Sequence, residues 1–298
     1  MQISELWWLL ALLGSCLIGV IIYINQVFKM PSSLLMIYRG CVVSLLLLPF
    51  IPFFTLPTDP IFWILSAIQG LLIAYSDKRT FLCSRIYGGE IVGSLRPFSV
   101  AMVFVVWWFV SPIQLLEMLK EPVQFCMIVL CMVGITYSLI IANTGKVTKD
   151  AFKELLPALI LFAVVDINNK YINTLGSVVG IYSSAFCYCF TTGLFAGLPN
   201  AITFFRHRDW RLVFAPRYVI GGLLMSLSII TVNFLKTPAM IYAPNPAYVS
   251  AIMAAFPVWI VAWNSIYYRL KGAEEFPHCN FKAVLLLLIS IVTLILLQ

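Results

Sequence analysis

Apolar runs long enough to cross a lipid bilayer recur from one end of the 298-residue chain to the other. Hydrophobic residues make up 62% of the sequence and charged residues only 10%, with a mean hydropathy of +0.99. A soluble domain carries roughly a quarter charged residues, so this chain could not cover a globular surface. About 20 apolar residues cross the hydrocarbon core as a helix, whereas a membrane barrel shows short alternating segments. The sequence therefore predicts an all-α polytopic membrane protein.

Ten transmembrane helices are predicted from the apolar runs and the residues that separate them. Prolines such as Pro31, Pro112 and Pro122 lie between runs, as does the polar stretch 143–154. These connections are too short to hold a soluble domain. The predicted spans are 6–24, 33–54, 61–76, 86–110, 123–142, 155–172, 180–203, 213–235, 247–268 and 281–297.

Lysine and arginine are distributed unevenly among the predicted loops. The loops after odd-numbered spans hold fourteen of them, and the loops after even-numbered spans hold two, Lys120 and Lys236. By the positive-inside rule, the odd loops are cytoplasmic and both termini lie outside. This topology accounts for the net charge of +7, and no nucleic-acid partner is expected.

Catalytic and metal-binding patterns are not found in the sequence. Most of the eight cysteines lie within apolar runs, without C-x-x-C pairs or a Cys/His ligand spacing. The two histidines, His207 and His278, lie in predicted loops, and neither a phosphate-binding loop nor a nucleophile elbow occurs. We therefore expect no metal, no cofactor and no enzymatic activity, and we interpret the cysteines as small packing residues.

Three pairs of segments match between the two halves of the chain, in the same order. Residues 86–108 align with 246–268, which places Pro97 opposite Pro257. Gly70–Ser76 aligns with Gly222–Ser228, and Tyr23–Gln26 aligns more weakly with Asp166–Asn169. The alignment predicts two five-helix repeats, 1–142 and 155–298, joined by the polar linker 143–154. Because five is odd, the second repeat would be inverted, as in alternating-access transporters.

With this arrangement the chain resembles the drug/metabolite transporter superfamily, of the ten-helix EamA-like kind. The resemblance rests on the two five-helix halves, a proline midway along the fourth and ninth helices, and Arg39 in the second ("MIYRGCVV"). A glycine-led third helix in each half and "KGAEE" (271–275) add to it. The chain departs from the pattern in lacking a Gly-Glu turn in its first half and a counterpart of Arg39 in its second. The resemblance implies a multi-pass transporter of the bacterial inner membrane; such proteins are usually drawn with cytoplasmic termini.

Glu90 and Arg96 are the first candidate site residues, because both lie inside a predicted span. A charge at the centre of a membrane helix costs about 2.5–3.5 kcal/mol on insertion scales, so it normally faces a partner or a water-filled cavity. Six residues separate them, or about 240° around a helix, so they do not share a face. Arg96 therefore either pairs with an acid on another helix or contacts substrate. Pro97 and Pro257 are expected to break their helices.

Other polar residues within or next to the spans complete the predicted site. Asp77, at the end of the third span, either belongs to a helix-end charge cluster at the interface or faces inward, where it would neutralise Arg39 or Arg96. Asp166 and Lys170 have the spacing of an intrahelical ion pair, and they are also candidates for binding substrate. Asn169 belongs to a polar belt that forms either a gate or the membrane interface. Four deeper aromatic residues are candidates for lining a pocket, with core packing as the alternative: Tyr38, Tyr75, Tyr248 and Trp263.

The sequence thus predicts a secondary transporter of a small polar metabolite, such as an amino acid or a nucleoside-type solute like S-adenosylmethionine. Arg39 and Arg96 would bind a carboxylate or phosphate, with Glu90 or Asp77 as partner for a coupling proton or cation. The alternatives are an exporter of organic-cation drugs, a membrane-embedded lipid-modifying enzyme and a structural scaffold. The expected partners are the solute and the lipid bilayer, and both a monomer and a homodimer are compatible with the sequence.

Overall fold

Every element of the described chain is a helix. The computed structural model describes residues 6–87, 89–142, 148–207, 210–256, 258–260, 262–263 and 281–297. In chain order the elements are α1 (Trp7–Phe28), α2 (Ser32–Ile37), η2 (Tyr38–Val42), α3 (Val43–Leu47), η3 (Leu48–Phe53), α4 (Pro60–Tyr87), α5 (Gly89–Val110), α6 (Pro112–Leu119), α7 (Pro122–Ala142), α8 (Lys149–Gly176), η4 (Ser177–Val179), α9 (Ile181–His207), η5 (Trp210–Phe214), α10 (Pro216–Tyr242), α11 (Pro246–Met253) and α13 (Phe281–Leu296). The predicted all-α class is confirmed.

The helices indicate a multi-pass membrane protein. Within the described residues, six spans are long and apolar enough to cross a bilayer, or seven if the bent pair α5–α6 counts as one. The six lie in α1, α2 to η3, α4, α7, α9 and α10. Length and composition alone therefore support fewer crossings than the ten predicted. The other predicted spans fall on α8, which is long but less apolar than the other long helices, and on the shorter helices α11 and α13.

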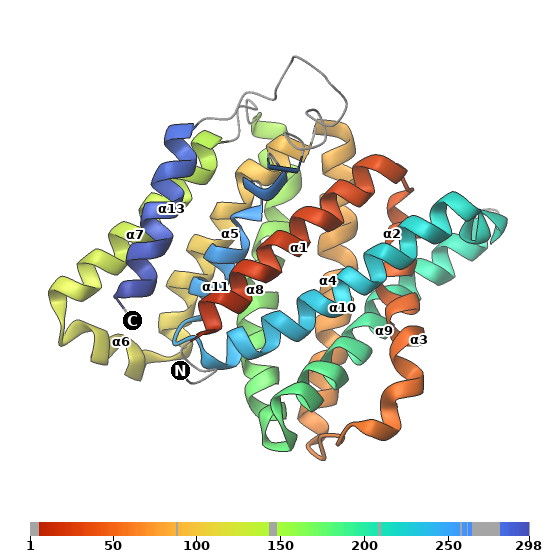
Figure 1. Cartoon of the computed structure of the whole chain (residues 1–298), viewed down its shortest axis with the longest axis horizontal. Helices are drawn as coiled ribbons and strands as arrows, with labels where there is room; N and C mark the ends of the chain where they lie inside the picture. Colours follow the sequence, from red (N-terminus) through yellow and green to blue (C-terminus); the bar gives the residue numbers. More distant parts are fainter. Residues whose placement is uncertain are drawn as a thin grey trace.

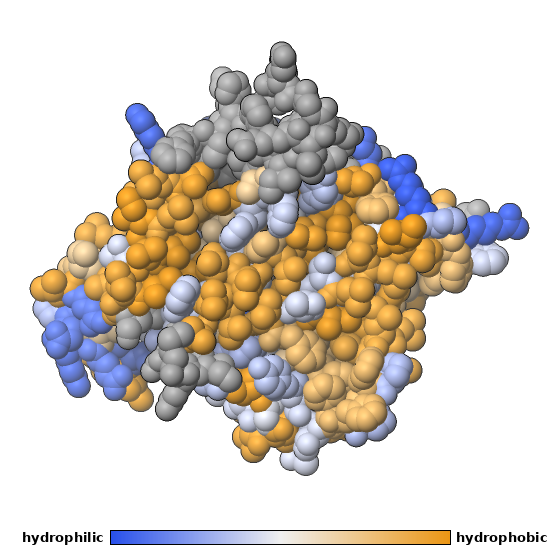
Figure 2. Space-filling model, in the orientation of Figure 1, coloured by the Kyte–Doolittle hydropathy of each residue, from blue (hydrophilic) through white to orange (hydrophobic). Residues whose placement is uncertain are grey.

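The outer surface of the molecule is apolar. Figure 2 shows hydrophobic residues across the middle of the visible face and hydrophilic residues towards its edges. Large side chains are strongly exposed there and elsewhere, among them Phe109 at 83% and Val123 at 78%. Contiguous apolar surface on this scale is rare on soluble proteins, and it is what lipid chains would cover.

The helices pack in pairs that join distant parts of the sequence. In Figure 1, α1 lies along α10, and α7 lies along α13 at one side of the molecule. α4 packs against both α8 and α9, and α5 packs against α8 and α11. The start of α1 and the end of α13 lie on the same side as α6 (Figure 1).

The second predicted span is not a regular helix. It consists of α2, the π-helical turn η2, α3 and the 3₁₀-helical turn η3. η2 crosses α9 at Gly193 and Gly197, where a Cβ on Gly40 would lie 2.3 Å from the backbone nitrogen of Gly197. Small residues four apart allow helix backbones to approach this closely in membranes. Backbone contact therefore sets the distance between η2 and α9.

Two helices extend well beyond their predicted ends, α4 and α10. The third span was expected to end at residue 76, but α4 continues to Tyr87, so Asp77 lies inside a helix. The eighth was expected to end at 235, but α10 continues to Tyr242 and includes Lys236. Neither stretch contains a glycine that would end the helix, and α10 even continues through Pro238. Charged residues were wrongly interpreted as helix ends at these two positions.

The two prolines expected to break helices lie in different contexts. α5 continues through Pro97. The chain turns only at Ser111, after which α6 lies at 98° to α5. Ser111 precedes Pro112, and a residue before proline is disfavoured in the α conformation. Pro257 lies outside the described residues; α11, on the same predicted span, ends at Met253.

Candidate functional site

A buried carboxylate joins three helices of the chain's second half. Asp166 on α8 accepts a hydrogen bond from Lys236 Nζ on α10 through Oδ1 at 2.7 Å, and from Ser250 Oγ on α11 through Oδ2 at 2.7 Å. The side chain of Asp166 is 5% exposed and that of Lys236 is 17% exposed. Sequence spacing predicted Lys170 as the ion-pair partner of Asp166. That prediction is wrong, because the carboxylate forms its ion pair with Lys236 on another helix.

Lys170 lies one turn further along α8 and contacts the end of α10. Its buried Nζ donates to the backbone carbonyls of Met240 at 2.8 Å and of Ala243, and it lies 5.8 Å from the ring centroid of Trp107. Carbonyls at a helix C-terminus lack partners within the helix, and a cation is favoured there by the helix dipole. Lys170 therefore stabilises the C-terminus of α10 from a neighbouring helix.

Asn169 belongs to a second polar group, between α4, α8 and α9. Its Nδ2 donates to the hydroxyl of Tyr188 at 2.7 Å, and Gln69 Nε2 donates to the same hydroxyl at 2.9 Å. Gln69 Nε2 also donates to the carbonyl of Val165, and its Oε1 accepts from Asn168 at 2.7 Å. Gln69 is fully buried and Tyr188 is 2% exposed. Asn169 is thus a member of a buried network.

Replacing Tyr188 with phenylalanine is expected to destabilise the fold by about 1–3 kcal/mol, because two buried amide donors then lose their acceptor. Thermal unfolding of the detergent-solubilised protein measures the change. Tyr182→Phe is the matched control, since Tyr182 is 58% exposed. Equal stabilities for the two variants would contradict the network.

Arg39 and Asp77 form an ion pair between η2 and α4. Arg39 Nη1 contacts Asp77 Oδ2; the Arg39 side chain is 28% exposed and that of Asp77 is 8% exposed. Of the two partners expected for Asp77, the structure brings Arg39 to it. π-helical turns inside α-helices are frequent at functional sites, and here the turn carries the arginine. This pair lies on helices other than those that carry the Asp166 cluster.

Among the described residues, three further predicted ones lie outside the Asp166 cluster and the network around Tyr188: Tyr75, Pro97 and Trp263. Tyr75 on α4 is 50% exposed and Trp263 is 37% exposed. Pro97 is buried within α5. The side chains of Glu90 and Arg96 lie outside the described residues, so their predicted roles stay predictions.

Lys236, Gln69 and Tyr188 were missed by the sequence reasoning. Gln69 could have been found, because it is a polar residue within an apolar run, and such residues are costly in a membrane helix. Lys236 was assigned to a loop when its helix was predicted too short. Nothing in the sequence pattern distinguished Tyr188 from the other tyrosines.

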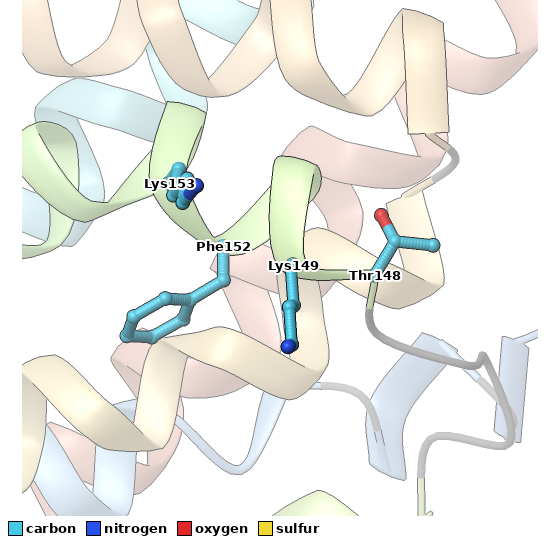
Figure 3. A pocket seen from close by; sticks show the side chains of 4 residues that line it. All are labelled: Thr148, Lys149, Phe152 and Lys153. Carbon is cyan, nitrogen blue, oxygen red and sulfur yellow. The ribbon is translucent and has the colours of Figure 1, made fainter.

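The surface also has a shallow hollow at the start of α8. Its volume is about 250 Å³, and Figure 3 shows the four side chains that line it: Thr148, Lys149, Phe152 and Lys153. The Thr148 hydroxyl is already used, since it accepts a hydrogen bond from the backbone N–H of Ala151 and caps the helix. The residues lining this hollow belong to neither buried polar group.

Within the described part of the chain, no group of three or more His, Cys, Asp or Glu side chains could hold a metal ion. Comparison with protein-family models gives no match for the chain, and comparison with curated proteins gives none either.

Proposed function

We propose that this protein is a secondary transporter that moves a small zwitterionic solute by alternating access. The observation that carries the proposal is the Asp166 carboxylate, shared between Lys236 and Ser250 on two different helices within an apolar bundle. Charged groups inside a membrane are costly, and they usually mark a substrate or ion pathway. An ammonium group of the solute would compete with Lys236 for Asp166, and its carboxylate would compete for the ammonium of Lys236.

Ten crossings in two inverted five-helix repeats are part of this proposal. α1, the α2–η3 segment, α4, α5 and α7 would correspond in order to α8, α9, α10, α11 and α13. If each helix is replaced by its counterpart in the other half, the α1–α10 contact becomes an α8–α4 contact, and the α1–α11 contact becomes an α8–α5 contact. Both of these contacts are present. Three further contacts join an element directly to its own counterpart: α5 with α11, α7 with α13, and η2 with α9. The start of α1 and the end of α13 on one side (Figure 1) agree with an even number of crossings.

The cluster is closed in this conformation. Asp166 is 4% exposed and Ser250 is 6% exposed. A solute would therefore reach Asp166 only after α10 or α11 has moved away from α8. Lys236 and Ser250 are on those two helices, so breaking their bonds to Asp166 would couple solute binding to helix movement.

Uptake into proteoliposomes tests the proposal. The purified chain is reconstituted and screened with labelled amino acids, nucleosides and S-adenosylmethionine, with protein-free liposomes as the blank. We expect saturable uptake of one zwitterionic class. The double variant Asp166→Asn with Lys236→Gln keeps a neutral hydrogen-bonding pair, so it should fold but lose at least roughly tenfold in uptake, the equivalent of about 1.4 kcal/mol.

Two results would count against transport by this route. The first is a lack of saturable flux for every solute from a folded, reconstituted protein. The second is full uptake by the double variant, which would make the ion pair a purely structural link between α8 and α10. Glu121→Gln is the matched control, because Glu121 is exposed and lies between α6 and α7.

A further inference from the structure

A second pocket lies away from the Asp166 cluster, where three segments meet. Its volume is about 180 Å³, and it is lined by the end of α5, by α6 and by the connection between α10 and α11. Trp107 and Trp108 come from α5, Glu117 from α6, Asn245 from the connection and Tyr248 from α11. The three aromatic residues give the pocket an apolar wall with a few polar groups, as is usual for sites that bind small molecules.

Two hydrogen-bond donors on residues that line this pocket lack acceptors within the described part of the chain. The indole Nε1 of Trp108 and the amide Nδ2 of Asn245 are buried, and neither has a hydrogen-bond partner in the described part of the chain. Asn245 is 3% exposed, and its Oδ1 is used to cap α11 by accepting from the N–H of Ala247. Buried donors are nearly always satisfied in proteins, so two unsatisfied donors on residues that line one pocket point to a ligand that carries an acceptor oxygen.

The same pocket also offers a site for a positive charge. Glu117 is exposed, and it forms no ion pair with any residue in the described ranges. The rings of Trp108 and Tyr248 attract cations through their π-electrons, whereas Trp107 already has Lys170 Nζ 5.8 Å from its ring centroid. The Trp107 indole is held in place, since its Nε1 donates to Gln114 Oε1 at 2.8 Å. A ligand with both an ammonium group and an acceptor group would therefore find partners for each.

Size and position restrict the ligand further. Pockets for drug-sized molecules usually measure about 300–1,000 Å³, so a pocket of about 180 Å³ suits a ligand the size of an amino acid or of a lipid headgroup. α6 lies at 98° to α5. If α5 crosses the bilayer, α6 lies roughly along its surface, and both neighbouring connections belong to the predicted outer side. The pocket is thus reached from the membrane interface or from the outer solution.

We propose that this pocket binds a small zwitterion, whose acceptor oxygens contact Trp108 and Asn245 and whose ammonium group contacts Glu117 and the aromatic rings. The same chemistry occurs in a free amino acid and in a phosphatidylethanolamine headgroup. The inference depends only on the pocket, so it goes beyond the proposed transport and does not rest on it.

Equilibrium dialysis with tritiated L-alanine tests the proposal on the full chain in phosphatidylglycerol nanodiscs. We expect one saturable site per chain, competed by phosphoethanolamine but not by acetate or ethylammonium, which carry only one of the two groups. Trp108→Phe removes one donor, and Asn245→Ser removes the other while keeping a helix-capping oxygen. Each variant, and Glu117→Gln, should weaken binding roughly tenfold, as expected for one charge-assisted hydrogen bond. Trp63→Phe and Glu121→Gln are the matched controls, since neither residue lines the pocket.

Nanodiscs containing phosphatidylethanolamine distinguish the two sources of the zwitterion. If the headgroup enters the pocket, alanine binding weakens in these discs, and native mass spectrometry shows a retained lipid that the Trp108 and Glu117 variants lose. If only free solutes enter, alanine binding is the same in both lipids. Either result supports a zwitterion site. The proposal is overturned if neither alanine nor the lipid binds, if acetate or ethylammonium competes as well as phosphoethanolamine, or if the pocket variants bind like the controls. Because dialysis needs no gradient, this outcome is independent of whether the protein transports.

Discussion

Replacing Lys236 with methionine should lower the free energy of unfolding by about 3–5 kcal/mol, the usual cost of removing one partner from a buried ion pair. The Asp166 side chain is only 5% exposed, so its carboxylate would keep Ser250 as a partner but lose its neutralising cation. Methionine preserves most of the length and apolar volume of the lysine stem, which separates the loss of charge from the loss of packing. Thermal unfolding in detergent, followed by circular dichroism, measures the change.

The double variant Lys236→Met with Asp166→Asn provides the internal control for this prediction. Because it removes both charges, it should recover most of the lost stability. Lys120→Met serves as the external control, since Lys120 is exposed at the end of α6. If the single variant unfolds at the wild-type temperature, the ion pair contributes nothing to the fold.

The helical fold could be predicted because a membrane imposes a simple rule on sequence. Backbone polar groups in lipid must be satisfied within the segment, so long apolar runs become helices. Polar residues inside those runs were also visible, and Asp166 and Lys170 were identified for that reason. The number of membrane crossings is harder to predict from the sequence, because α8 carries several of these polar residues and is less apolar than the other long helices.

Partners of buried charges could not be predicted, because they depend on tertiary packing. The spacing of Asp166 and Lys170 favoured an intrahelical pair, yet Asp166 pairs with a lysine 70 positions away. An intrahelical pair contributes only about 0.2–0.5 kcal/mol. In this packing Lys170 instead contacts carbonyls at the end of α10, which have no partners within their own helix. Local spacing is therefore a weak guide wherever a neighbouring helix offers a stronger partner.

Replacing Gly197 with alanine is expected to destabilise the protein by about 1–3 kcal/mol, the usual cost of overpacking a close contact. A Cβ at this position would lie 2.3 Å from the backbone nitrogen of Cys41 and 2.9 Å from the backbone carbonyl carbon of Gly40. Backbone atoms cannot turn aside as a flexible side chain does, so α9 and η2 would have to separate. In an isolated helix the same change would instead stabilise by about 1 kcal/mol. The sign of the effect therefore distinguishes backbone contact from helix propensity.

Gly14→Ala is the matched control, because the new Cβ would meet only the side chain of Met253, whose terminal methyl group would lie at 3.0 Å. That side chain has freedom to move, so the control should be neutral or slightly stabilising. Thermal unfolding of both variants under the same conditions gives the comparison.

A separation of η2 from α9 would also shift Arg39, which lies directly before Gly40, relative to Asp77 on α4. Gly197→Ala should therefore impair any uptake that depends on this ion pair at temperatures where the variant is still folded. Unchanged stability and uptake would mean that the two backbones tolerate a wider spacing than the contact between them implies.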